Sequence, residues 1–278
     1  MSGVHPAPSA NFWRTFREVD SHDAGAMVEW LDYIATLPPV GAAKEQALRL
    51  LAVSPGDRVL DVGCGTGHEV AALGALVGSM GSVTGLDNSA ALIAAARRRA
   101  TGAGGSVEFV LGDAHTLPFP NEHFNAVRAD RTLQHLAEPE RGLREMVRVL
   151  RPGGRIVVTE GQWSLEAPSL DGGVTRSVVD QLFGADDRRA WVGHLLPFMY
   201  RMVGLMHAEL VSHTAEIRDP ESLRRVLKLD WATERLIERG ELSQAAADRW
   251  LEELYASIAS GEACGKLVLV HLGAVKPA

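Results

Sequence analysis

The sequence predicts an α/β protein with a mainly parallel sheet and helices on both of its faces. Between residues 58 and 161, short apolar segments bounded by turn residues alternate with helical segments. Alternation of strands with helices of about 10–15 residues is typical of a parallel sheet. At 278 residues, of which 46% are hydrophobic, the chain is also long enough to bury a full core around such a sheet.

The central region is predicted to contain five strands and the helices between them. The strands are expected at 58–63, 82–87, 107–113, 124–130 and 154–161, and the helices at 69–78, 89–100 and 139–150. The last of these helices has a clear stop at Arg151-Pro152-Gly153-Gly154. A basic residue suits the final turn of a helix, and Pro and Gly cannot continue it.

The flanking regions are predicted to be mostly helical. Expected there are an amphipathic helix at 23–35, a break at Pro38-Pro39, a helix at 42–53, helical structure at 171–205, a strand at 208–217, two amphipathic helices within 221–260 and a closing strand at 266–275. The predicted domains are an N-terminal helical cap at 1–53 and a second domain at 54–278 with a helical insertion at about 219–260. The cap and the insertion are expected to form a lid over the carboxyl ends of the strands, where such sheets bind ligands.

Charge and composition argue against several classes of protein. The formal net charge of −7 disfavours a nucleic-acid partner, because nucleic-acid binders carry an excess of Lys and Arg. The two cysteines, Cys64 and Cys264, form no CxxC pair, which disfavours a disulfide scaffold or a zinc site. The first residues have neither a charged start nor an apolar stretch, so we expect no signal peptide, and no apolar stretch reaches the length of about 18–20 residues that a membrane helix needs. We expect a cytoplasmic protein with no membrane partner and no metal; a homo-oligomer stays open.

A glycine-rich loop follows the first predicted strand, in the stretch VLDVGCGTG at residues 59–67. Gly63, Gly65 and Gly67 lie where the strand turns into a helix, and glycine there permits positive φ and close approach of a ligand. A dinucleotide-binding GxGxxG motif that started at Gly63 would need a glycine at His68, and one that started at Gly65 would need a glycine at Val70. The loop therefore does not match this motif.

Acidic residues end three consecutive strands, and their charge indicates the ligand. Asp61 lies two residues before the first glycine, where a carboxylate disfavours pyrophosphate and favours a ligand with positive charge. S-adenosylmethionine carries a sulfonium and an ammonium and has no phosphate. Asp87 ends the second strand, where a carboxylate can accept both ribose hydroxyls. Asp113, with Ala114 beside it, ends the third and is placed for the adenine. Each aspartate alone also fits as the cap of a loop.

With these motifs the chain resembles the class I S-adenosylmethionine-dependent methyltransferases. It is similar, within that family, to ubiquinone/menaquinone-biosynthesis and bacterial natural-product small-molecule methyltransferases. The resemblance runs from about residue 58 to 160 and rests on VLDVGCGTG, GLDNS, GDAHTLPFPNEHFNAV and LRPGGRIVVTE. It implies a Rossmann-like sheet of seven strands, the last antiparallel, which suits KLVLVHLGAV at 266–275.

The resemblance also implies the cofactor and its contacts. S-adenosyl-L-methionine is expected to bind along the loop of Gly63, Cys64, Gly65 and Gly67, with its ammonium group near Asp61. Its ribose is expected at Asp87 and Asn88, and its adenine at Asp113 and Ala114. Its methionyl part is expected near Asp130 and Arg131. S-adenosyl-L-homocysteine is the expected product. Some relatives methylate amide or base nitrogens with an N/D-PP-Y/F sequence, and this chain has ADRTLQHL in its place. Nucleic-acid and protein substrates are therefore not favoured.

Catalytic residues are harder to predict than cofactor residues. His135 lies just past the fourth strand on the ligand side, and its imidazole could take a proton from the acceptor. Its other interpretation is a packing or capping residue of a short helix, since histidine is frequent there in the family. Glu160 and Trp163 follow the fifth strand and are further candidates for the acceptor side.

Two classes of function are compatible with these motifs. The first is a methyltransferase acting on a small-molecule metabolite in secondary metabolism or quinone-type biosynthesis. The second is an enzyme of the same fold that binds S-adenosylmethionine but catalyses a cyclisation, decarboxylation or rearrangement. Both would use the same cofactor motifs, so the sequence does not separate them. A protein that only binds the cofactor is a third and weaker alternative.

Overall fold

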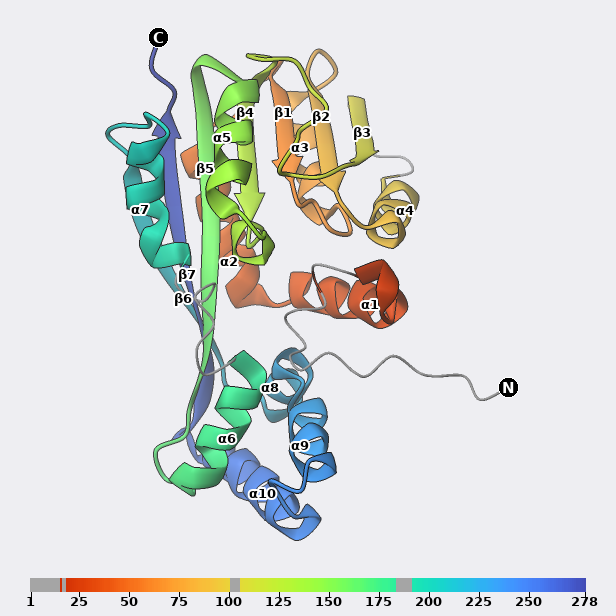
Figure 1. Cartoon of the computed structure of the whole chain (residues 1–278), viewed down its shortest axis with the longest axis vertical. Helices are drawn as coiled ribbons and strands as arrows, with labels where there is room; N and C mark the ends of the chain where they lie inside the picture. The colour runs from red at the N-terminus through yellow and green to blue at the C-terminus, as the bar shows by residue number, and fades with distance from the viewer. Residues whose placement is uncertain (1–15, 17–18, 101–105, 184–191) are drawn as a thin grey trace. The chain divides into compact units, whose positions relative to one another are not determined.

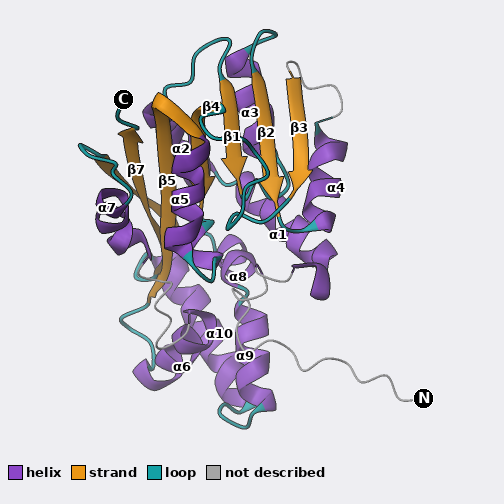
Figure 2. Ribbon diagram, turned by 45° about the horizontal axis from the view of Figure 1, so that its top comes forward, coloured by secondary structure: helices purple, strands orange, loops and turns teal. Residues whose placement is uncertain are grey.

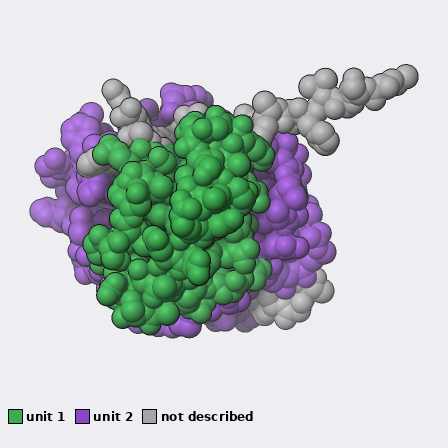
Figure 3. Space-filling view, turned by 90° about the horizontal axis from the view of Figure 1, so that it is seen from below, with its two compact units in different colours: residues 1–18, 163–187, 217–266 green, residues 19–162, 188–216, 267–278 purple. Residues whose placement is uncertain are grey.

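The computed structural model describes residue 16 and residues 19–100, 106–183 and 192–278 (Figure 1). Parts of the regions that were predicted to be helical, namely residues 11–15, 17–18 and 184–191, lie outside the described residues. The chain divides into two compact units (Figure 3). Unit 1 comprises 1–18, 163–187 and 217–266, and unit 2 comprises 19–162, 188–216 and 267–278.

The seven strands form one sheet. They are β1 (Arg58–Val62), β2 (Ser82–Asp87), β3 (Ser106–Leu111), β4 (Phe124–Asp130), β5 (Leu150–Glu166), β6 (Glu209–Ile217) and β7 (Cys264–Val275), in the order β3-β2-β1-β4-β5-β7-β6. Strands β3, β2, β1, β4 and β5 pair in parallel, and the common direction of β1, β2 and β3 is visible in Figure 2. The end of β7 runs antiparallel to the start of β5, since Gly153 and Gly154 exchange backbone hydrogen bonds with Lys276. The predicted fold class is confirmed.

The helices in the described part of the chain surround this sheet or belong to unit 1. They are α1 (Ala24–Ala35), α2 (Pro38–Leu51), α3 (His68–Val77), α4 (Ala90–Arg99), α5 (Pro139–Val149), α6 (Gly172–Phe183), α7 (Val192–Met202), α8 (Pro220–Leu227), α9 (Leu229–Glu238) and α10 (Gln244–Ser260), with short 3₁₀ turns at Val19–Ser21 and Leu133–His135.

Two apolar cores cover the two faces of the sheet in unit 2. On one face, α5 and α7 pack against alternate strand residues that include Val62, Val127 and Val158. On the other, α2, α3 and α4 pack against residues that include Val59 and Val157. Because side chains alternate along a strand, these two sets lie on opposite faces. The near-continuous apolar strands follow from burial on both sides.

Three sequence predictions of element boundaries differ from the structure. The break predicted at Pro38-Pro39 lies just before them, between α1, which ends at Ala35, and α2, which begins at Pro38. Proline is tolerated in the first turn of α2 because no backbone N–H is needed there. The single helix predicted after residue 221 is split into α8 and α9 at Lys228, whose φ of 56° ends one helix and begins the next. The fifth strand is longer than predicted, since β5 runs to Glu166.

A side chain links β5 to β7. The hydroxyl of Tyr200, from α7, donates to the carbonyl of Leu272 at 2.7 Å and accepts from the N–H of Val158 at 3.1 Å. Tyr200 is fully buried, and burial raises the pKa of its phenol well above the usual value. The hydroxyl therefore remains protonated and completes the strand pairing.

We expect the substitution Tyr200→Phe to lower the free energy of unfolding by about 1–3 kcal/mol, because two buried backbone groups lose their partner. Tyr255→Phe is the matched control, because the buried Tyr255 hydroxyl has no hydrogen-bond partner among the described residues. Its loss is expected to change the free energy of unfolding by less than about 0.5 kcal/mol. Urea denaturation of both variants measures the difference; equal effects would contradict the role given to Tyr200.

Candidate functional site

The glycine loop joins β1 to α3 in a backbone conformation that only glycine adopts readily. Gly63, Gly65 and Gly67 have φ values of 73°, 53° and 76°. The N–H groups of Gly63 and Cys64 both donate to the carbonyl of Leu86, at 2.7 and 2.9 Å, which ties the loop to β2. Cys64 itself is buried, and burial raises the pKa of its thiol.

Two of these glycines also lie in close contact with neighbouring side chains. A Cβ at Gly63 would overlap the side chain of Thr132, and one at Gly67 would lie 2.9 Å from Ala96 and Phe109. Thr132 donates from its hydroxyl to the carbonyl of Val62 at 3.1 Å. Thr132 was not predicted from the sequence, and no local pattern reveals it, because it meets the loop only in the folded chain.

Asp87 is held by the loop and by the start of α4. One carboxylate oxygen accepts from the N–H of Gly65 at 2.9 Å, and the other from the N–H of Ser89 at 3.0 Å. The side chain is 8% exposed, and burial raises its pKa although these N–H groups oppose the shift. Each oxygen keeps a lone pair, so the carboxylate can accept two further donors such as the hydroxyls of a ribose.

Asp61 is buried beside an arginine on the neighbouring strand. It is in register with Arg128 of β4, and their side chains approach to 3.6 Å. Burial raises the pKa of Asp61 to about 7, although the positive charge of Arg128 opposes this. The Nη1 atom of Arg128 has no hydrogen-bond partner among the described residues.

Asp130 is bound to two guanidinium groups. It accepts from Arg128 at 3.1 Å and from Arg131 at 2.9 Å. Burial alone would raise its pKa, but Arg131 and Arg128 hold that pKa far below the usual value. Asp130 and Arg131, expected near the methionyl group, are thus paired with each other. Asp61 therefore has both positively charged groups, such as Arg128, and the negatively charged Asp130 near it.

The same face of the sheet continues to a histidine on β7. Thr159 of β5 is in register with Asp130, and its hydroxyl lies 2.9 Å from Nδ1 of His271. His271 is fully buried, its pKa is lowered by that burial, and its Nε2 atom has no hydrogen-bond partner in the described part of the chain. The strand that carries His271 was predicted from the sequence, but the residue itself was not singled out.

The predicted adenine and ribose residues at the ends of β2 and β3 differ in exposure. Asn88 is exposed and Ala114 is buried. Asp113 is exposed and accepts from the backbone N–H of His115 at 2.8 Å. Burial acts against the shift, but this bond and the His115 ring lower the pKa of Asp113. Asp113 thus differs from the buried Asp61 and Asp87.

His135 ends the 3₁₀ turn after β4, beside a buried carboxyl group. Glu160 accepts from the N–H of Leu133 at 2.8 Å, and burial raises the pKa of Glu160 to about 8. The Gln134 amide, oriented so that each contact joins a donor to an acceptor, donates to the carbonyl of Gly161 at 3.0 Å and accepts from His135 Nε2 at 3.2 Å. In that arrangement the neutral His135 ring has its acceptor at Nδ1.

Asp32, on α1, binds the glycine loop. It accepts from the Thr66 hydroxyl at 2.9 Å, lies 3.1 Å from the ring of His68, and pairs with Arg99 at 2.6 Å. Arg99 also donates to the carbonyl of Thr66. Asp32 was not predicted as a site residue, although the helix that carries it was predicted.

Asp20 binds the start of α4. Its carboxylate accepts from the hydroxyl of Ser89 at 2.5 Å and from the N–H groups of Ala90 and Ala91 at 2.7 and 3.2 Å. The hydrogen bond from Ser89 is the main cause of a lowered pKa. Asp20 was not predicted from the sequence either, since it lies outside every motif.

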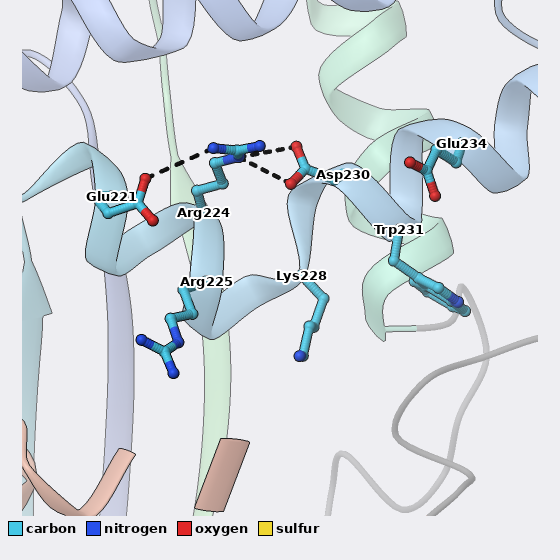
Figure 4. Close-up of a pocket in the computed structure, with 7 residues that line it drawn as sticks. All are labelled: Glu221, Arg224, Arg225, Lys228, Asp230, Trp231 and Glu234. Atoms are coloured by element: carbon cyan, nitrogen blue, oxygen red, sulfur yellow. Dashed lines mark hydrogen bonds and ion pairs between the residues drawn. The ribbon is translucent and has the colours of Figure 1, made fainter. Parts of the chain in front are cut away.

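Unit 1 has a surface hollow of its own, of about 450 Å³, on α8 and α9 (Figure 4). Arg224 lies 2.8 Å from Asp230 and 3.7 Å from Glu221. The lining contains three basic and three acidic side chains beside Trp231, so its charge favours neither anions nor cations. The lining residues are Glu221, Arg224, Arg225, Lys228, Asp230, Trp231 and Glu234.

Membrane-spanning helices and metal-binding clusters are both absent from the described residues. No helix there is long and apolar enough to cross a membrane. No group of three or more His, Cys, Asp or Glu side chains in that part of the chain is arranged to hold a metal ion.

Comparisons with known proteins agree with this geometry. Residues 60–158 match the family described as "Methyltransferase domain". A 37.1 kDa uncharacterized protein in transposon TN4556 of Streptomyces fradiae is 36% identical over 234 residues, 82% of this chain and 66% of that protein. The ubiquinone/menaquinone biosynthesis C-methyltransferase UbiE of Pseudomonas savastanoi is 42% identical over 119 residues, 42% of this chain and 46% of that enzyme. The chain thus spans less than half of UbiE.

Solved structures extend the likeness in fold. Phosphoethanolamine N-methyltransferase 2 of Haemonchus contortus, in complex with phosphomonomethylethanolamine and S-adenosylhomocysteine, has a TM-score of 0.57 and 20% identity over 98% of this chain and 62% of that one. With the glycine loop and the buried Asp87 at the strand ends, the match over residues 60–158 identifies this part of the chain as a class I S-adenosylmethionine-dependent methyltransferase domain. S-adenosylmethionine is the cofactor of that family.

We expect stability to fall with rising pH through Glu160. Its pKa in the folded state, about 8, exceeds its ordinary value of 4.5, so the folded state holds the proton more tightly. The resulting stability is complete below the ordinary pKa and is lost as the pH rises through about 8. The free energy of unfolding of the wild type, relative to Glu160→Gln, should therefore decrease from about pH 5 to about pH 8.

Glu145→Gln is the control for this experiment. The pKa of Glu145 is lowered from 4.5, mainly by its bond to Arg148, so its carboxyl group is largely ionised in both the folded and the unfolded state over this interval. The wild type and Glu145→Gln should keep a constant difference in urea denaturation. If the difference in free energy of unfolding between the wild type and Glu160→Gln were also constant with pH, burial would not raise the pKa of Glu160.

Proposed function

We propose that the protein transfers a methyl group from S-adenosylmethionine to a small-molecule metabolite, in secondary metabolism or quinone-type biosynthesis. The observation that carries the proposal is the Asp87 carboxylate, held by Gly65 and Ser89 beside the glycine loop, with lone pairs left for a ribose. The matched family supports this assignment. Replacement of Asp87 tests it most directly.

The residues around Asp87 suit the rest of the cofactor. The buried Asp61 carboxyl offers oxygen acceptors for the ammonium group, and Arg128 Nη1 offers a donor that has no hydrogen-bond partner among the described residues. We assign Asp130 and Arg131 to the methionyl end, and Asp113, Ala114 and Asn88 to the adenosine end. Gly63, Gly65 and Gly67 would let the backbone approach the ligand, with Cys64 between them.

Bound S-adenosylmethionine supplies an activated methyl group on a sulfonium. The protein aligns the acceptor and, where the acceptor carries a proton, removes it. We assign this role to His135, whose ring is oriented by the Gln134 amide, which in turn donates to Gly161 and Glu160.

The acceptor class is the least constrained part of the proposal. The net charge of −7 disfavours a polyanion such as nucleic acid. The similarity to UbiE, a C-methyltransferase of ubiquinone/menaquinone biosynthesis, favours a small organic acceptor. We propose a cytoplasmic enzyme in which 1–53 form a helical cap and 219–260 an insertion within 54–278. A homo-oligomer is compatible with this proposal.

We expect Asp87→Asn to weaken binding of S-adenosylhomocysteine by at least about tenfold. An amide nitrogen cannot accept a hydrogen bond, so in this variant the N–H of either Gly65 or Ser89 loses its acceptor. Isothermal titration calorimetry measures the dissociation constant. Asp57→Asn is the control, since Asp57 accepts from Ser54 on an exposed turn and should leave affinity unchanged. Equal affinities for wild type and Asp87→Asn would remove Asp87 from the site.

Methyl transfer itself is tested with trideuteromethyl S-adenosylmethionine and small-molecule extract, followed by mass spectrometry. One labelled methyl in a new product, with matching S-adenosylhomocysteine, is the expected result. A new product without the label would instead support the cyclisation, decarboxylation or rearrangement class. Once the labelled product has identified the acceptor, turnover of that acceptor by His135→Ala should be lower by about 10²-fold. An unchanged kcat would show that His135 only packs the turn.

A further inference from the structure

We propose that Asp32 of α1 is a positioning residue for the cofactor, which fixes the glycine loop so that Gly65 presents its N–H to Asp87. This inference rests on the proposed function, because it takes the ribose to bind at Asp87. It concerns a residue that precedes the matched family region, which begins at residue 60. Asp32 acts through the loop and has no contact of its own with the ligand.

The carboxylate of Asp32 connects three elements of unit 2. Its Oδ1 atom accepts from the Thr66 hydroxyl at 2.9 Å and lies 3.1 Å from Nε2 of His68, the first residue of α3. Its Oδ2 atom accepts from Arg99, the last residue of α4, at 2.6 Å. Arg99 also donates to the carbonyl of Thr66. Asp32, Thr66 and Arg99 thus form a closed ring of contacts that joins α1, the glycine loop and α4.

Thr66 carries this constraint to the proposed ribose position. It is buried between Gly65 and Gly67, which both have positive φ values, of 53° and 76°. Glycine allows a wide range of backbone conformations, so a loop with two of them needs contacts from outside to hold one conformation. Asp32 supplies such a contact at the Thr66 hydroxyl, next to the Gly65 N–H that donates to Asp87 at 2.9 Å.

The location of Asp32 favours a role in the loop over a role in overall stability. Figure 1 shows α1 beyond the carboxyl ends of β1 and β2, beside α4. The side chain of Asp32 is 37% exposed, and an ion pair at this exposure contributes little to the stability of a fold. Burial opposes the shift, but the hydrogen bonds with Thr66 and His68 lower the pKa of Asp32, which is therefore ionised near neutral pH.

The test is calorimetric titration of the full chain with S-adenosylhomocysteine. Asp32→Ala removes the carboxylate, and Thr66→Val replaces the hydroxyl by a methyl group of similar size. Each should raise the dissociation constant by about fivefold or more, because the loop is no longer held in the conformation that binds. Adding Thr66→Val to Asp32→Ala should raise it little further, since both changes remove the same hydrogen bond.

A second comparison separates positioning from a general effect on the fold. If Asp32 acts through Gly65 and Asp87, then Asp32→Ala should weaken binding less in an Asp87→Asn background than in the wild type. A residue that only stabilises the fold would give the same fold-change in both backgrounds, because effects at independent sites add.

Asp23→Ala is the matched control. Asp23 caps α1 by accepting from Ala26 at 2.9 Å, so its loss weakens the same helix but leaves the contacts of Asp32 in place. Its dissociation constant should stay within about twofold of the wild type. An unchanged dissociation constant for Asp32→Ala, or an equal fold-change in both backgrounds, would overturn this inference alone. Failure of the wild type to bind S-adenosylhomocysteine would instead overturn the proposed function.

Discussion

The site depends on the carboxylate of Asp87, which is fixed between two backbone N–H groups. Gly65 belongs to the loop after β1 and Ser89 to the start of α4, so one side chain sets the spacing between two elements that surround the ligand position. The bonds also compensate part of the cost of burying the charge. Gly65 donates to Asp87 from a backbone conformation with positive φ. This conformation explains why residue 65 is a glycine, because a Cβ there would not meet any neighbouring side chain too closely.

Burial of charge extends from Asp87 across the sheet. Asp61, Arg128 and Asp130 lie side by side on β1 and β4, and Thr159 and His271 continue the polar layer onto β5 and β7. Buried ion pairs contribute little net stability, because desolvation offsets their attraction. Two of the buried polar atoms that lack a partner among the described residues, on Arg128 and His271, lie in this layer. A layer of this kind is better explained by ligand binding than by stability.

The sequence predicts what depends on local pattern. The alternation of strands and helices, the glycine loop and the acidic ends of β1 and β2 all follow from spacing along the chain. Thr132, Asp20, Asp32 and His271 could not be predicted, because each reaches its partner across a long sequence separation. Ser89 and Asp20, for example, are 69 positions apart. Pro38 shows a smaller error: the predicted break lies just before it and the proline itself begins a helix, because the effect of a proline depends on the turn it occupies.

The hydroxyl of Tyr200 has a consequence for the order of folding. It joins Val158 to Leu272, residues that the chain separates by most of unit 1 as well as by α7 and β6. Contacts between distant segments form late, because loop closure costs entropy before the contact returns any energy. During synthesis, β1 to β5 can pair as they emerge, whereas β7 must wait until residues 267–275 are made. The half of the sheet that carries the glycine loop is then ready before the strand that carries His271 joins it.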